Sequence, residues 1–110
     1  MAISVNLYYK GEKGKARKFA QEMIESGTVA AIRAEEGNIC YEYFIPIDDP
    51  ETVLLIDAWR DQAAIDVHHA SPMMRKISEL REKYDLHMEA GRFVSDVDGL
   101  PNEDMKYIRN

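Results

Sequence analysis

The sequence has a single cysteine, few prolines and no long apolar run. Cys40 is the one cysteine among 110 residues, so an internal disulfide is impossible and a cysteine-based metal site would lack partners. No apolar run approaches the roughly 20 residues that span a bilayer. The N-terminal residues show no basic start followed by an apolar stretch, as a signal peptide would. We therefore expect a cytoplasmic protein with no membrane partner.

The chain also lacks a basic balance. It carries 14 Lys and Arg against 20 Asp and Glu, a net charge of −6, which repels the phosphate backbone of a nucleic acid. A basic stretch at residues 10–18 could bind phosphate, but a solvated helix face explains it better. We expect no nucleic-acid partner.

The composition that is present suits one globular domain. Hydrophobic residues make up 45% and charged residues 31%, which are ordinary values. Alternation and β-forming residues predict strands at residues 3–9, 38–45, 52–59 and 86–97.

Three helical segments lie between these strands. An apolar stripe that begins at Ala16 predicts a helix from Lys15, which kinks near Ser26 and ends at Gly37. A second helix is expected over residues 62–69, capped by Asp61. A third is expected to start at Ser71 and Pro72.

The predicted order β-α-β-β-α-α-β is typical of the split βαβ, ferredoxin-like α+β fold, with helices on one face of an antiparallel sheet. Apolar residues occur on both sides of the strand at 52–59, so the second face also needs cover. The simplest cover is a second copy, which gives a homodimer whose sheets close into a dimeric α+β barrel. Residues 1–97 would form the domain. The tail, residues 98–110, would pack on the partner subunit and bury Leu100, Met105, Tyr107 and Ile108.

Two adjacent histidines on the predicted helix at 62–69 are the first candidates for chemistry. His68 shares its side of the helix with Ala64, so we expect it to face the sheet. His69 is turned by roughly 100° and should lie at an edge. Diverging histidines do not chelate one metal well, so we expect no metal site. His68 is either a half-buried helix residue with a hydrogen bond to a strand, or a general base in a pocket.

Other residues could complete such a pocket. Trp59 ends the adjoining strand, and Asn6 is a polar residue between Val5 and Leu7 in the first strand. Aromatic walls with a few polar groups suit a small apolar aromatic ligand. The candidate wall residues are Tyr41, Tyr43, Met73, Ile77 and His69. Each alone is more often a packing residue, and the two tyrosines could equally lie at a dimer interface.

The segments "EEGNICYEYF" and "DDPETVLLIDAWRDQAAIDVHHASPMM" resemble the antibiotic biosynthesis monooxygenase family, which includes quinol monooxygenase-like proteins. The resemblance covers roughly residues 3–96. The matching positions are Gly37, Tyr41, Glu42, Asp49, Pro50, Trp59, Ala63, His68, Ser71 and Pro72.

This resemblance implies a dimeric α+β barrel with a pocket in each protomer between sheet and helices. For some members it implies oxidation of quinols or polycyclic phenols by O₂ without a cofactor. His68 would then be the base or the partner of the substrate anion. Asn6 and Trp59 would orient the substrate.

Some positions depart from the family pattern. Asp57 stands where the family more often has Glu, and Met73 where His or an aromatic residue is common. One branch degrades haem, using an Asn in the first strand, a Trp and a His. Asn6 matches that branch, but His68 replaces its Trp and Ser78 occupies its His position. Haem is therefore not expected here.

The sequence leaves more than one function open. The first hypothesis is a cofactor-independent monooxygenase that oxidises a quinol or phenol with O₂ as co-substrate. The alternative is a non-catalytic dimeric module of the same fold that binds a small ligand or a partner. A cofactor-free acid–base enzyme such as an isomerase is a third. The first and third need a base in the pocket, and the second does not.

Overall fold

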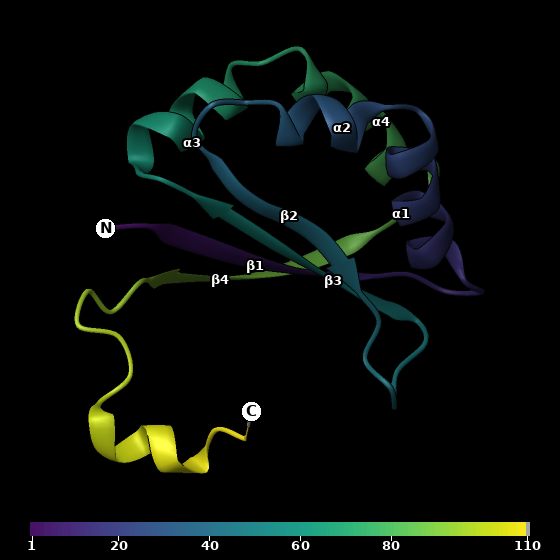
Figure 1. Ribbon diagram of the computed structural model, residues 1–110. Coiled ribbons are helices and arrows are strands. Elements are labelled where there is room, and N and C mark those ends of the chain that lie inside the picture. Colours follow the sequence, from purple (N-terminus) through teal and green to yellow (C-terminus); the bar gives the residue numbers. More distant parts are fainter. Residues whose placement is uncertain (110) are drawn as a thin grey trace.

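The computed structural model describes residues 1–109. Four antiparallel strands form one sheet in the order β2-β3-β1-β4, and the helices α1–α4 all lie on one face of it (Figure 1). This confirms the ferredoxin-like α+β class. The elements are β1 (Ile3–Lys10), α1 (Lys15–Glu25), α2 (Thr28–Arg33), β2 (Asn38–Phe44), β3 (Thr52–Trp59), α3 (Gln62–His69), α4 (Met73–Lys83), β4 (His87–Val94) and a 3₁₀ helix, η1 (Asn102–Tyr107).

The predicted helix from Lys15 to Gly37 is in fact two helices. Gly27 has φ of 82°, a left-handed conformation that glycine adopts without steric strain, and the chain restarts there as α2. The expected kink is therefore a break. α2 ends at Arg33 rather than at Gly37.

The predicted starts of the two later helices agree more closely with the structure. The Asp61 carboxylate accepts a hydrogen bond of 2.9 Å from the backbone N–H of Ala64, as expected of an N-cap. α4 begins at Met73 after Pro72, and no side chain caps it. Ser71 instead has a buried hydroxyl with no hydrogen-bond partner within residues 1–109.

The main core fills the space between the helices and the near face of the sheet. Alternate residues of β1 and β3 point into it, among them Ile3, Tyr9, Leu55 and Trp59. β4 contributes little, since seven of its eight residues are exposed. The helix layer therefore leaves the β4 side of the sheet open.

Gly37 sets the position of α3. A Cβ atom at Gly37 would overlap the methyl group of Ala64, so the absence of a side chain lets α3 lie against the start of β2. The backbone N–H of Arg60 also donates to the Gly37 carbonyl at 2.8 Å. Contrary to the expectation, Gly37 therefore does not end a helix. It instead allows the close packing that holds α3, the helix that carries His68.

The far face of the sheet has no helix cover (Figure 1). Its side chains include Tyr8, Phe44 and Phe93, which are exposed, and Leu54 and Ile56, which are partly exposed. The tail lies on the same side of the sheet, and none of the residues of η1 is buried. Within residues 1–109, no helix has the length and apolar character needed to cross a membrane.

Substitution at Gly37 tests the contact with Ala64. Gly37→Ala should lower the free energy of unfolding by about 1–3 kcal/mol because it overpacks this contact. Ala64→Gly alone should cost about 1 kcal/mol as a helix glycine. The double variant should lose less than the sum of the two, measured by urea unfolding in a double-mutant cycle. The control pair, Gly37→Ala with the exposed Ala63→Gly, should be additive. Additive losses in the Ala64 pair would contradict the contact.

We propose that a second copy covers the exposed sheet face and that the tail packs on that partner. Tyr107 is 76% exposed and Leu100 60%, and the tail lies on the side from which a partner sheet would approach. Burial of such side chains is the main favourable term in association. Light scattering should show a dimer, and deletion of residues 98–110 should weaken it and lower Tm. A deleted variant that stays dimeric with unchanged Tm would refute the tail's role.

Candidate active site

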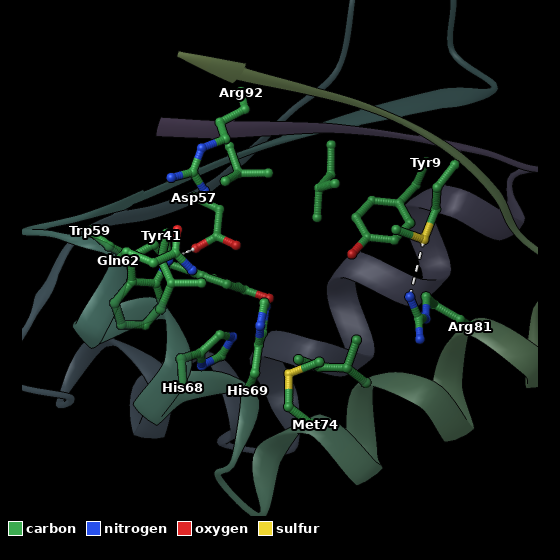
Figure 2. Close-up of a pocket in the computed structure, with 15 residues that line it drawn as sticks. Tyr9, Tyr41, Asp57, Trp59, Gln62, His68, His69, Met74, Arg81 and Arg92 are labelled. Atoms are coloured by element: carbon green, nitrogen blue, oxygen red, sulfur yellow. Dashed lines mark hydrogen bonds between the residues drawn. The ribbon is translucent and has the colours of Figure 1, made fainter. Parts of the chain in front are cut away.

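A cavity of about 270 Å³ lies between the near face of the sheet and the helices α3 and α4 (Figure 2). One row of paired residues crosses its floor through all four strands. Tyr41 pairs with Asp57, Asp57 with Val5, and Val5 with Arg92. The floor thus runs from a phenol through a carboxyl and an apolar side chain to a guanidinium.

Helix residues form the roof of the cavity. Ile65, His68 and His69 come from α3, and Met74, Ile77 and Arg81 come from α4. Trp59, at the end of β3, closes the cavity near α3. The cavity therefore combines apolar walls with a few polar groups, which is typical of a site for a small organic ligand.

His68 is buried at the α3 end of the cavity. Its Nδ1 lies 2.7 Å from Oε2 of Glu35, which follows α2. Because a carboxylate accepts a hydrogen bond, this contact places a proton on Nδ1. In the neutral ring with this tautomer, the other nitrogen, Nε2, carries a lone pair that can accept a proton, and no hydrogen bond to it is found within residues 1–109.

Trp59 and Asp57 support the His68 ring from below. The rings of Trp59 and His68 are stacked, with centroids 4.6 Å apart and an angle of 29° between their planes. The indole Nε1–H of Trp59 donates to the Asp57 carboxylate (Figure 2). A continuous chain of contacts, Asp57–Trp59–His68–Glu35, therefore holds the imidazole in one orientation.

Burial shifts the pKa values of the ionisable groups near His68. Desolvation raises the pKa of the Asp57 carboxyl above its ordinary value, against the hydrogen bond from Trp59 that lowers it. Desolvation also raises the pKa of Tyr9 to about 12 and raises the pKa values of Tyr41 and Tyr43. The tyrosine hydroxyls stay protonated at neutral pH.

Five of the predicted site residues line this one cavity: His68, Trp59, Tyr41, Ile77 and His69. His68 is buried and His69 is exposed at the rim, as the helix geometry predicts. The structure therefore brings together residues from β2, β3, α3 and α4.

The other three predicted residues are not at the cavity. Asn6 was expected beside His68 and Trp59, but Val5 and Leu7 face the cavity, so Asn6 points to the far face of the sheet. There its Oδ1 accepts a hydrogen bond of 3.0 Å from Ser4. The expected position of Asn6 is wrong because strand alternation places it on the other side.

Tyr43 and Met73 were expected on the cavity walls and also lie outside it. Tyr43 is on the near face, but its ring packs edge-on against Phe19 of α1, with centroids 6.3 Å apart. Met73 borders a shallow surface depression with Gly27 and Ala31, near α2. Met74, one residue later, lines the cavity instead.

Several residues in or beside the cavity were not among the predicted site residues. Asp57 had a signal, because it lies two residues before Trp59 in a strand and so shares its face. Glu35, which contacts His68 but does not line the cavity, had no signal, since this contact joins residues 33 positions apart. Gln62, Tyr9, Arg81 and Arg92 also line the cavity.

The side chains described do not form a metal site. Within residues 1–109, no group of three or more His, Cys, Asp and Glu side chains is placed to hold a metal ion. The acidic and histidine side chains of the cavity instead make the specific contacts given above.

Comparisons with known proteins agree with this architecture. Residues 2–80 match the sequence profile of the family described as antibiotic biosynthesis monooxygenase. The Bacillus subtilis protein named "Putative monooxygenase YcnE" is 31% identical over 67 residues, which are 61% of this chain and 68% of that protein.

Solved structures share the fold. A conserved protein from Methanosarcina mazei has a TM-score of 0.75 at 23% identity, with 87% of this chain and 94% of the other covered. SnoaB from Streptomyces nogalater, a cofactor-independent oxygenase, has a TM-score of 0.71 at 15% identity, with 86% and 93% covered. At these identities the likeness shows the fold alone.

Asp57→Asn tests the raised pKa of the Asp57 carboxyl. A carboxyl with a raised pKa binds its proton more tightly when folded, so its effect on stability becomes unfavourable as pH rises above the unfolded value of about 3.9. Asn still accepts from Trp59 but carries no charge. The Tm of the variant minus the Tm of wild type should therefore increase as the pH rises from 3.5 to 7. The exposed Asp66→Asn is the control and should show no such trend. A relative loss of Tm with rising pH would contradict the assignment.

Proposed function

The chain belongs to the antibiotic biosynthesis monooxygenase family, and on this premise we propose that it is a cofactor-independent monooxygenase that oxidises a small quinol or phenol with O₂. The observation that carries the proposal is the buried His68 ring, held between Glu35 and Trp59 at the wall of the cavity. A fixed imidazole with one free lone pair is the group needed to take a phenolic proton.

The first step is the removal of a substrate proton. Nε2 of His68 accepts the proton of the phenol while Nδ1–H remains bonded to Glu35. The imidazolium that results is stabilised by the Glu35 carboxylate at 2.7 Å. The substrate is left as an electron-rich phenolate beside a cation, and this raises its tendency to give up an electron.

The second step uses O₂ as the electron acceptor. The phenolate transfers one electron to O₂, and the substrate radical and superoxide combine with formation of a C–O bond. Cleavage of the O–O bond leaves one oxygen atom on the substrate and releases the other as water. For a hydroquinone the balance is hydroquinone plus O₂ giving hydroxyquinone plus water, so the substrate supplies all the electrons.

The cavity walls suit such a substrate. Tyr41 and Trp59 offer aromatic surface, and Ile65 and Ile77 offer apolar surface, which together exclude water from the anion. Trp59 and Asp57 act as positioning residues, since they reach the substrate's base through the stacked ring. Asn6, Tyr43 and Met73 lie outside the cavity and have no role in the proposal.

Two findings support chemistry that needs no cofactor. SnoaB, which shares the fold, is itself a cofactor-independent oxygenase. The haem-degrading branch of the family uses a Trp and a His at the positions where this chain has His68 and Ser78. The substrate is then both the ligand and the reductant.

O₂ uptake with menadiol tests the function. Wild type should consume O₂ faster than the uncatalysed rate, and His68→Ala should lower kcat/KM by about 10²-fold or more, because a positioned base contributes about that factor. His87→Ala, on the exposed strand β4, should match wild type. Glu35→Gln should lower kcat and shift its pH profile with little change in KM.

Two results would contradict the proposal. One is equal activity of wild type and His68→Ala. The other is tight binding of menadiol by wild type with O₂ uptake at the uncatalysed rate, which would favour a ligand-binding module of the same fold.

A further inference from the structure

The cavity has a second polar group far from His68. Tyr9 from β1 and Arg81 from α4 lie at the end opposite Trp59 and His68, and the Tyr9 hydroxyl points toward the middle of the cavity (Figure 2). The proposed proton transfer uses neither residue. Their position suggests a separate part of the ligand to bind.

Tyr9 offers a hydrogen-bond donor to the cavity. The residue is only 2% exposed, and within residues 1–109 no hydrogen bond to its hydroxyl is found. The hydroxyl is not one of the fully buried atoms without a partner, so it meets the open space of the cavity. Burial keeps the hydroxyl protonated, so it remains a donor at neutral pH. This hydroxyl can therefore donate a hydrogen bond to a ligand oxygen in the cavity.

Arg81 is a cation without a carboxylate partner. Its guanidinium donates to the sulfur of Met88 at 3.2 Å and to the hydroxyl of Ser78 at 3.2 Å, and among residues 1–109 no acidic side chain is within ion-pair distance. On the same helix, Arg75 pairs with Glu79 and Lys83 with Glu22.

The positive charge of Arg81 also acts on Tyr9, because it lowers the pKa of the Tyr9 hydroxyl against the larger, opposite effect of burial. A half-buried guanidinium carries five N–H donors that match the geometry of a carboxylate. Arg81 and Tyr9 can therefore donate to one anion together.

We infer that Tyr9 and Arg81 bind a carboxylate of the substrate, so that the substrate is a hydroxyaromatic acid. This inference rests on the proposed function, which places the phenol at His68. The Asp57 carboxyl near His68 disfavours an acid at that end, and the Arg81 cation favours it at the other. The two ends of the cavity therefore set the direction in which the substrate lies.

Arg92 is the other cation of the cavity. It is exposed and lies in the same row of the sheet as Asp57, separated from it by Val5. It faces the rim rather than the α4 end where Tyr9 lies, and it is the natural comparison for Arg81.

Isothermal titration calorimetry with 6-hydroxy-2-naphthoic acid and 6-hydroxy-2-naphthamide tests the inference without turnover. The two probes share the phenol and ring system and differ in charge at the far end. Wild type should bind the acid about tenfold more tightly than the amide, as expected for a charge-assisted hydrogen bond near solvent. Arg81→Gln should abolish this preference, and the exposed Arg75→Gln should keep it. Arg81→Lys, which retains the charge, should keep part of it.

Several outcomes would overturn the inference. They are equal affinity of wild type for both probes, no binding of either, a preference that survives Arg81→Gln, or a preference lost in Arg92→Gln instead. If Arg81→Gln shows no thermal transition, Tyr9→Phe decides, because removal of one of the two donors must reduce the preference. An acid preference without O₂ uptake would contradict the oxygenase proposal alone, and O₂ uptake without the preference would contradict this inference alone.

Discussion

The hydrogen bond between Glu35 and His68 is the interaction on which the rest of the site depends. Both side chains are largely buried, with 14% and 4% of their surface exposed. A buried carboxylate or imidazole without a partner is expensive, so each makes the burial of the other tolerable. The bond also ties the segment after α2 to the last turn of α3. It therefore fixes the ring nitrogen that stays free for chemistry.

The stack of His68 on Trp59 extends this order to the sheet. Trp59 is held in turn by its hydrogen bond to Asp57, so the imidazole is fixed from both sides. Such supporting contacts are what hold a catalytic group in a productive geometry. The pKa of Asp57 is raised because burial disfavours the ionised carboxylate and only one described donor, Trp59, offsets this effect.

The uneven cover of the sheet explains why a cavity exists here. α1 and α2 pack closely over Tyr43, Val53 and the neighbouring strand residues, whereas β4 has no helix above it. The space under α3 and α4 is therefore filled only in part. One end of it carries His68 and Trp59, and the opposite end carries Tyr9 and Arg81. One end suits proton transfer and the other suits recognition of an anion.

The sequence by itself determined the order of strands and helices, the fold class and the part of the site near His68. These follow from periodicity, which is local, and from the helix geometry that turns His68 inward and His69 outward. It did not place Asn6, because alternation tells which residues share a face of a strand and not which face meets the cavity. It did not place Tyr43 or Met73, because packing against α1 covers Tyr43 and the orientation of α4 turns Met74 rather than Met73 toward the cavity. The partners Glu35, Tyr9 and Arg81 became visible only in three dimensions, since packing of α2, α4 and β1 brings together side chains that no short-range pattern connects.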